Sequence, residues 1–267
     1  MDPYKASLSE LKEALVKYKG RRFDSLLETL EQDPRVGAKK MAKSQRNKIK
    51  RSRDEDARLL RMMKFERMLE KQGYKLIAGA DEVGRGALAG PLVAASVILK
   101  TREKIPRIND SKKLTSGLRE ELSSIIKERA VAWAIAEISH TEIDENGLQA
   151  ANLKALRDAV DRLTIKPDYI ISDGFKFQAG NLPVMALIKG DTLSQTVAAA
   201  SIIAKVHRDE LMTALHEEYP NYGFSGNKGY GSAGHIKAVK KDGACPFHRV
   251  SFLTTVEMSM NQIELEI

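Results

Sequence analysis

Apolar residues in the first quarter of the chain recur every three or four positions, a spacing that predicts helices. Three such stripes are formed by Leu8, Leu11, Leu15 and Tyr18, by Leu26, Leu27 and Leu30, and by Leu59, Met62, Met63, Phe65, Met68 and Leu69. Gly20, the pair Asp33-Pro34, Gly37 and Gly73 lie between or after these stripes, where helix stop signals are expected. Residues 1–73 are therefore predicted to form a small all-helical unit.

The pattern changes at Tyr74, after which short apolar runs alternate with amphipathic stretches. The runs predict strands at Lys75–Ala80, Leu92–Leu99, Val131–Ile138, Tyr169–Ser172 and Val184–Ile188. Helices are expected near Leu118–Arg129, Leu148–Leu163, Thr192–Glu217 and Ile236–Lys241. The first two runs are joined by a connection too short for a crossover helix and should pair antiparallel, whereas later runs separated by helices should be parallel. Residues 74–267 are thus predicted to form an α/β domain, a mixed five-stranded sheet flanked by helices with a C-terminal helical segment.

Composition narrows the class of protein. The chain has 267 residues and is 42% hydrophobic, which is enough to bury a core. Its N-terminus lacks the apolar core of a signal peptide, and no apolar run long enough to span a membrane follows, so we expect a cytoplasmic protein without a membrane partner. The single cysteine, Cys245, excludes an intramolecular disulfide and a multi-cysteine zinc site.

Positive charge is concentrated in the helical unit. Residues 1–73 carry 20 Lys and Arg against 12 Asp and Glu, and the remainder carries 24 of each. The segment Lys39–Arg53 holds eight basic residues and no acid. Such a run attracts a polyanion by phosphate contact and counterion release, and it is equally typical of a solvated helix face. We expect residues 1–73 to be a basic extension that binds nucleic acid, with the solvated face as the alternative.

Acidic residues stand where the predicted strands end. Asp81 and Glu82 follow the first run, Asp173 follows the fourth, and Asp191 follows the fifth. Ligands gather at the carboxyl ends of strands in open α/β sheets, so acids from separate strands can converge there. Adjacent strand residues point to opposite faces, so Asp81 and Glu82 share a site only if the strand bends or ends. Any one of these acids alone is more typical of a turn or a helix cap, and Asp191 before Thr192 fits an N-cap.

Crowded carboxylates repel one another, and a divalent cation resolves the repulsion. Oxygen ligands suit Mg²⁺ or Mn²⁺, and the pattern fits a phosphodiesterase that uses two metal ions. A glycosidase would use paired acids in another way, but it needs an aromatic sugar cleft and this chain is 6% aromatic.

The loop Gly84-Arg85-Gly86 follows the first two acids directly. Glycines on both sides of an arginine let the backbone approach a polyanion while the guanidinium contacts phosphate. A glycine-rich hairpin turn is the alternative. A dinucleotide fingerprint is excluded, because the segment that follows is a strand rather than a helix.

Seven motifs occur in order along residues 74–255. They are D-E-V-G-R-G from Asp81, N-D-S-K-K-L from Asn109, S-D-G from Ser172, K-G-D from Lys189, A-S-I-I-A-K-V-H-R-D from Ala200, N-K-G-Y-G-S from Asn227 and H-R-V-S-F from His248. Together they resemble bacterial ribonuclease HII. The resemblance implies a ribonuclease H-like mixed sheet and an endoribonuclease that cuts the RNA strand of RNA–DNA hybrids and nicks duplex DNA on the 5′ side of an embedded ribonucleotide.

The resemblance also implies residue roles. It makes Asp81, Glu82, Asp173 and Asp191 a catalytic tetrad that binds Mg²⁺ or Mn²⁺, and it makes Gly84, Arg85 and Gly86 the reader of the ribonucleotide's backbone and phosphate. Tyr230 would stack on the sugar of the next deoxyribonucleotide, and otherwise fits a surface packing residue. Contacts to the substrate backbone are expected from Lys112, Lys113, Lys205 and Arg208, although the last two equally fit a solvated helix face. The expected partners are RNA–DNA hybrids and duplex DNA containing ribonucleotides, bound by a monomer.

Two other interpretations stay open. Ribonuclease HIII is a close relative that handles single ribonucleotides poorly, but that family resembles D-E-V-G-T-G and usually ends its tetrad in Glu, so Arg85 and Asp191 favour type HII. A nucleic-acid-binding factor without turnover is the second, because a fold does not guarantee chemistry. The sequence does not identify a proton carrier among its histidines, for which we expect structural or surface roles, and the tail Glu257–Ile267 contains no recognisable docking motif for a sliding clamp.

Overall fold

The computed structural model describes residues 2–253 and divides into two compact units between Arg58 and Leu59. The sequence analysis placed this boundary after residue 73. The division comes earlier because Leu59 and Met62 pack in the same apolar cluster as the central strands, and Leu69 packs against the sheet residue Ile171. The tail Glu257–Ile267 lies outside the described residues.

The first unit is helical, as predicted. It contains α1 (Leu8–Lys17), α2 (Arg21–Gln32) and the larger part of α3 (Val36–Met62). Ser7 and Glu10 form a capping box that starts α1. The core of the unit consists of buried residues from all three helices, namely Leu11, Leu15, Leu26, Leu27, Leu30, Ala38 and Ala42. Gly37 lies in the first turn of α3 and does not stop a helix, contrary to the expectation.

The second unit is built on a five-stranded sheet with the order β3-β2-β1-β4-β5, which confirms the predicted mixed sheet. The strands are β1 (Ile77–Val83), β2 (Leu92–Ile98), β3 (Ala132–Ile138), β4 (Tyr169–Asp173) and β5 (Val184–Leu187). β1 pairs antiparallel with β2 and parallel with β4, and β4 pairs parallel with β5. β3 pairs antiparallel with β2, although a helix separates them in the chain. The expectation that β3 would be parallel was wrong. Residues 99–115 lead away from the end of β2, and α5 (Ser116–Arg129) returns to the same end of the sheet. β3 therefore starts where β2 ends, and Ala132 pairs with Ile98.

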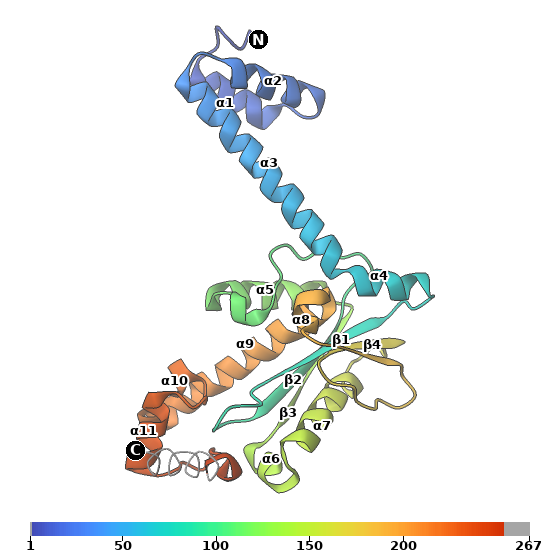
Figure 1. The fold of residues 1–267 in the computed structure, drawn as a ribbon, viewed down its shortest axis with the longest axis vertical. Helices are drawn as coiled ribbons and strands as arrows, with labels where there is room; N and C mark the ends of the chain where they lie inside the picture. The colour runs from blue at the N-terminus through green and yellow to red at the C-terminus, as the bar shows by residue number, and fades with distance from the viewer. Residues whose placement is uncertain (1, 254–267) are drawn as a thin grey trace, which may run out of the picture. The chain divides into compact units, whose positions relative to one another are not determined.

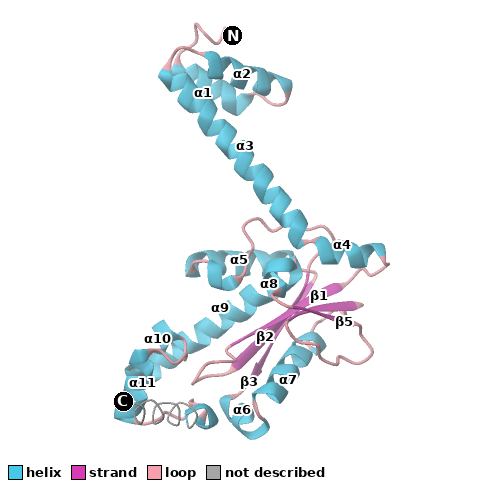
Figure 2. Ribbon diagram, viewed as in Figure 1, coloured by secondary structure: helices cyan, strands magenta, loops and turns pink. Residues whose placement is uncertain are grey.

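Helices cover both faces of the sheet (Figures 1 and 2). One face packs on α6 (His140–Asn146) and α7 (Leu148–Asp161). The buried alanines of α7 belong to the same apolar cluster as Ala78 and Ala80 of β1. The other face packs on α5 and α9 (Gln195–Glu218). Gly79 allows α9 to approach closely, because a Cβ there would lie 2.1 Å from the carbonyl carbon of Thr196. The α9 face of β1 therefore lies directly beneath the start of α9.

The remaining elements of this unit lie before, between and after the strands in the chain. They are α4 (Lys64–Lys71), the 3-10 turns η1 (Ser111–Lys113) and η2 (Pro220–Tyr222), and the helices α8 (Gly190–Leu193), α10 (Phe224–Asn227) and α11 (Ala233–Asp242). The single helix expected at Thr192–Glu217 is two helices, because Ser194 interrupts it and accepts the N–H of Val197 as the N-cap of α9. In the described part of the chain, no helix combines the length and the apolar character that crossing a membrane requires.

Candidate active site

Asp81 and Asp173 lie at equivalent positions on neighbouring strands. The last paired residues of β1 and β4 are Ala80 and Ser172, and an aspartate follows directly on each strand. Residues in register on parallel strands about 4.8 Å apart point to the same face, so the two carboxylates share one side of the sheet. That side is the α9 face, because the Ser201 hydroxyl on α9 donates a hydrogen bond to Asp81.

Glu82 follows Asp81 one residue before β1 ends at Val83, and its charge adds to the raised pKa of Asp81, so the two carboxylates lie near each other. The Glu82 N–H donates to Oδ1 of Asp81 at 2.8 Å, and Glu82 Oε1 lies 3.8 Å from Nε of Arg85. The other carboxylate oxygen, Oε2, is buried and accepts no hydrogen bond. Burial raises the pKa of Glu82 to about 7, although the Arg85 guanidinium lowers it. This oxygen is therefore a buried acceptor without a donor, which a bound cation would satisfy.

Asp191 lies in the first turn of α8 and is buried. Burial, and then the charges of Asp110 and Asp173, raise the pKa of Asp191 to about 6. The N–H of Gly190 donates to Oδ1 of Asp173 at 2.6 Å, which holds the turn that carries Asp191 beside β4. Because Ser194 caps α9, the alternative of Asp191 as the cap of that helix is excluded.

Asp110 is a further acid of this site, and the sequence analysis missed it. Its charge raises the pKa of Asp191 and of Asp173. Its carboxylate caps η1 by accepting the N–H of Lys112 at 2.9 Å, and it lies 3.6 Å from Nζ of Lys113. The signal was its place inside N-D-S-K-K-L, but Asp110 follows no predicted strand and so did not match the strand-end pattern.

The acids raise one another's pKa, which is the electrostatic signature of a cation site. Burial raises the pKa of Asp81 well above its usual range, and the charges of Glu82 and Asp173 add to the effect. Burial also raises the pKa of Asp173, against the opposing hydrogen bond from Gly190. Within residues 2–253, no three His, Cys, Asp or Glu side chains already stand in an arrangement that could hold a metal ion. The donors still fit Mg²⁺ or Mn²⁺, because they are all carboxylates and one of their buried oxygens has no partner.

The loop Gly84-Arg85-Gly86 leads away from β1. Gly84 has φ 97°, and a Cβ there would lie 2.3 Å from Nε of Arg208, so a glycine is required. Gly86 is exposed, which leaves its backbone free to approach a ligand. The Arg85 guanidinium stacks on the Phe175 ring at 4.3 Å, and its Nε is buried without a hydrogen-bond partner. Arg85 is thus held in place with unused donor capacity.

Tyr230 lies beside this loop. An isolated bridge joins Ala87 to Tyr230, and the N–H of Leu88 donates to the carbonyl of Gly229 at 2.8 Å. The Tyr230 ring is half-buried, with the Arg208 guanidinium 5.3 Å and the Lys205 ammonium 6.0 Å from its centroid. The structure therefore brings the glycine-rich loop and Tyr230 together, although they are far apart in the sequence.

Arg208 is not part of a solvated helix face, so that expectation was wrong, and its contact with the substrate backbone stays a prediction. Its side chain is fully buried on α9 and donates to the carbonyls of Pro91 at 2.9 Å, Lys228 at 2.8 Å and Ala89 at 3.2 Å. It therefore ties the segment after the glycine-rich loop to the loop that carries Tyr230. Its long side chain is drawn inward because these carbonyls require donors that the sheet does not supply.

Arg249, a residue that the sequence analysis quoted but did not assign, does the same from the C-terminal segment. It is fully buried and donates from Nε and Nη2 to the carbonyl of Gly90, at 3.0 Å and 2.9 Å, and from Nη1 to the carbonyl of Arg85 at 3.0 Å. Two buried arginines thus hold the backbone around the glycine-rich loop. No sequence signal separates them from exposed arginines, since their partners are main-chain oxygens.

The three lysines that were expected to contact the substrate backbone differ in their exposure and in their ion pairs. Lys112 and Lys113 are exposed, and the charge of Lys112 lowers the pKa of both Asp173 and Asp191, which places it at the acidic site. Lys205 is half-buried, with Nζ 2.7 Å from Oδ1 of Asp209.

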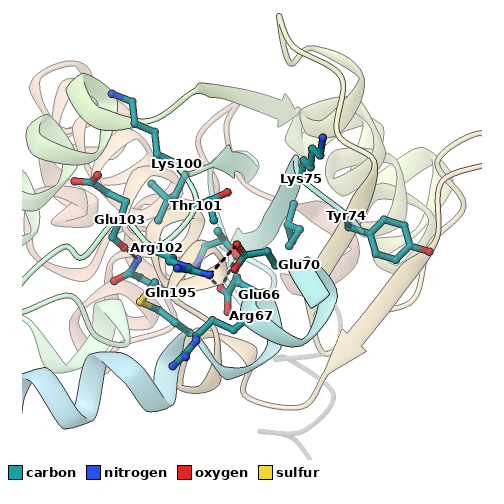
Figure 3. Close-up of a pocket in the computed structure, with 14 residues that line it drawn as sticks. Glu66, Arg67, Glu70, Tyr74, Lys75, Lys100, Thr101, Arg102, Glu103 and Gln195 are labelled. Atoms are coloured by element: carbon teal, nitrogen blue, oxygen red, sulfur yellow. Dashed lines mark hydrogen bonds and ion pairs between the residues drawn. The ribbon is translucent and has the colours of Figure 1, made fainter. Parts of the chain in front are cut away.

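The pocket in Figure 3 is separate from the four acids of the tetrad. It lies between α4, the start of β1, the segment after β2 and the start of α9. None of the tetrad lines it. Arg102 pairs there with Glu70 at 3.4 Å, and Glu66 Oε1 accepts the N–H of Thr196 at 3.0 Å and the hydroxyl of Ser194 at 2.6 Å. Glu66 thus joins α4 to the first turn of α9, next to the α8 turn that carries Asp191.

Comparisons with known proteins show which family the chain is similar to in sequence and fold. The family model described as Ribonuclease HII matches residues 78–255, and the model described as Ribonuclease HII N-terminal domain matches residues 7–70. A ribonuclease HII of Clostridium acetobutylicum is 41% identical over 94% of this chain and 99% of its own. Among solved structures, the ribonuclease H2 of Pyrococcus horikoshii is 28% identical, with a TM-score of 0.57 over 69% of this chain and 98% of that chain. The ribonuclease HII of Archaeoglobus fulgidus, solved as a complex with PCNA, is 27% identical with a TM-score of 0.58 over 67% of this chain and 94% of that one.

Proposed function

The chain belongs to the ribonuclease HII family and is therefore a ribonuclease H-type endonuclease for RNA–DNA hybrids, and we propose that it also nicks duplex DNA on the 5′ side of a single embedded ribonucleotide by two-metal-ion catalysis. Asp81, Glu82, Asp173 and Asp191 hold the cations in this proposal. The observation that supports it most is the convergence of buried and half-buried, mutually repelling carboxylates from β1, β4 and α8 beside the glycine-rich loop and Tyr230.

The residues of this chain have separable tasks in the reaction. When bound, Mg²⁺ or Mn²⁺ supplies an activated water and stabilises the leaving 3′ oxygen. Asp81 and Asp173 hold the cation site from one face of the sheet, and Asp191 approaches from α8. Glu82 supplies its unpartnered Oε2, and the Ser201 hydroxyl orients Asp81 and favours its ionised form against the effect of burial. Because the side chains do not yet form a ligand set, we propose that small rotations draw them around the cations.

Recognition of the ribonucleotide follows from the neighbouring loops. A 2′-OH is the group that distinguishes RNA from DNA at one position. Backbone groups of Gly84, Arg85 and Gly86 would read it together with the adjacent phosphate, and Tyr230 would stack on the next sugar. The main-chain bond between Leu88 and Gly229 fixes the spacing between these two readers. Lys112 and Lys113 would contact the strand backbone near the acids.

The test is a DNA duplex that carries one ribonucleotide, incubated with Mg²⁺ or Mn²⁺ and the full chain. We expect a nick on the 5′ side of the ribonucleotide, with loss of cleavage in Asp81→Asn and Asp191→Asn. These substitutions keep the side-chain size and remove the charge that binds cations. Binding of the duplex by the same variants, measured by fluorescence anisotropy, separates lost chemistry from lost folding.

Two other results would contradict the proposal and favour a different function. Cleavage of long hybrids without nicking at a single ribonucleotide would favour a ribonuclease HIII-like activity. Binding of both substrates without cleavage under either cation would favour a non-catalytic binding factor.

A further inference from the structure

Five of the eight basic residues in the α3 segment Lys39–Arg53 lie on one side of the helix. Lys39, Lys43, Arg46, Lys50 and Arg53 are spaced alternately four and three residues apart. At 100° per residue this spacing keeps them within about 40° of one line along the helix. The side chains of all five residues are exposed. We call these five residues the basic stripe.

The basic stripe is mostly free of acidic neighbours. No Asp or Glu occurs between Lys39 and Arg53. Arg46 forms an ion pair with Glu31 at 2.8 Å, and the charge of Lys39 contributes to the low pKa of Asp33. For the other three members, the described residues 2–253 provide no ion-pair partner. Like charges on successive turns of one helix repel, so the arrangement costs the isolated helix stability rather than supporting it.

The fold of the unit does not need the basic stripe. The core-facing side of this stretch consists of Ala38, Met41, Ala42 and Ile49, which pack against α1 and α2. A row of exposed cations that lies outside the core and raises the helix's electrostatic energy is explained most simply by a polyanionic ligand.

The dimensions fit a nucleic-acid duplex. From Lys39 to Arg53 the helix rises about 21 Å at roughly 1.5 Å per residue. This length corresponds to about six base pairs of duplex at roughly 3.4 Å per pair along each strand. A membrane surface is the less suitable polyanion, because an interfacial helix inserts an exposed apolar face and the apolar residues of this stretch pack into the unit's own core.

We propose that the basic stripe binds the phosphate backbone of a nucleic-acid duplex at a site separate from the catalytic acids, without regard to sequence or to the presence of a ribonucleotide. The stripe would hold the enzyme on DNA between cleavage events. This binding does not depend on the proposed nicking activity.

The experiment measures affinity for a DNA duplex that contains no ribonucleotide, without divalent cations, over a range of salt concentrations. The full chain is compared with the triple variant Lys43→Gln/Lys50→Gln/Arg53→Gln. If each side chain neutralises one phosphate, the slope of log affinity against log salt should become shallower by about 2.7, from roughly 0.9 per phosphate contact. Affinity at low salt should fall by at least about tenfold.

A charge-matched control is available in the same unit. Lys12, Lys17 and Lys19 are also exposed, and Lys12→Gln/Lys17→Gln/Lys19→Gln removes the same charge from a surface other than α3. We expect this control to keep most of the salt slope. Equal slopes for the two triple variants would overturn the proposal, because binding would then follow net charge alone. Retained duplex binding by the stripe variant together with lost binding to anionic lipid vesicles would also overturn it.

A further readout keeps this result distinct from the catalytic proposal. The rate of cleavage in single-turnover experiments at saturating enzyme should be unchanged in the stripe variant, since none of its residues belongs to the catalytic unit. Helix content by circular dichroism should also be unchanged, because the substituted side chains are exposed.

Discussion

The imidazole rings of His235 and His248 are both buried, with 3.0 Å between their Nε2 atoms. The contact of His235 Nδ1 with the Tyr230 carbonyl at 2.9 Å requires an N–H there, because a carbonyl only accepts. His248 Nδ1 accepts the N–H of Cys245 at 2.9 Å, so the proton of this ring is on Nε2, which donates to Nε2 of His235. This arrangement requires two neutral rings, and it anchors the Tyr230 loop to the C-terminal segment.

The histidine pair predicts a loss of stability in acid. Burial lowers the pKa of His248 to about 4 and also lowers the pKa of His235. An unfolded histidine takes up a proton near pH 6.5, so as the pH falls from about 6.5 to 4 the unfolded state binds protons that the folded state excludes. The contribution of His248 to the free energy of unfolding should therefore fall by about 2 kcal/mol over this range. Urea denaturation at several pH values measures it.

The variant His248→Gln tests this assignment, because its amide keeps a donor near the Nε2 position and does not titrate. Its stability should depend less steeply on pH between 4 and 6.5 than that of the unsubstituted chain. His207 contacts Glu137 at 2.7 Å, away from the buried pair, and His207→Gln provides the control for removing a histidine elsewhere. Parallel profiles for parent and His248→Gln would contradict the neutral pair.

Arg208→Lys distinguishes a structural role from a direct phosphate contact. Lysine keeps the charge but cannot donate to three carbonyls in one plane, so we expect about 2 kcal/mol less stability. The loops that carry Arg85 and Tyr230 should lose their fixed spacing, which predicts a several-fold higher KM for a single embedded ribonucleotide with a smaller change in kcat. Steady-state kinetics measure both parameters. Unchanged KM would instead fit a direct phosphate contact, for which lysine substitutes well.

The strand ends could be predicted from the sequence, and the buried arginines could not. Asp81 and Asp173 each come directly after an apolar run, which is a local signal for a buried strand followed by an acid. In the structure, these runs form neighbouring buried strands that carry the two acids. Arg208 instead occupies a helix position that an exposed residue fits equally well, and its burial depends on the carbonyls of Ala89 and Lys228. Those contacts arise only when distant loops meet, so no local pattern records them. Asp110 also approaches Asp173 and Asp191 only when distant segments meet, so no local sequence pattern predicted its place in the site.

Repulsion among the acids should destabilise the protein in the absence of cations. Asp191 has its pKa raised to about 6, so the folded state releases its proton at higher pH than the unfolded state does. The contribution of Asp191 to stability should therefore fall as the pH rises from about 4 to 6, opposite in sign to the contribution of His248, and the cost should persist at pH 8. Asp191→Asn should raise the metal-free melting temperature at pH 8 by about 3 °C, which corresponds to about 1 kcal/mol.

Added Mg²⁺ or Mn²⁺ should raise the melting temperature of the parent chain more than that of Asp191→Asn, since binding to the folded state stabilises it by mass action. Differential scanning calorimetry in chelator and in metal gives both values. A parent chain that melts at the same temperature with and without metal would show that these carboxylates do not bind it.

Removal of the Ser201 hydroxyl should shift the pH profile of cleavage. Ser201 donates to the Asp81 carboxylate, which lowers the pKa of Asp81 against the effect of burial, and it lies 3.0 Å from the hydroxyl of Ser111. In Ser201→Ala the pKa of Asp81 should rise further, so the ionised form that binds cations appears only at higher pH. The acidic limb of the single-turnover rate should move up by about one pH unit, as expected for a hydrogen bond to a charged group.

Ser123→Ala is the matched control, because the Ser123 hydroxyl is buried on α5 without a hydrogen-bond partner and its removal should leave the profile in place. If the two serine variants share one profile, Ser201 only fills space, and the orientation of Asp81 must come from its neighbours in β1.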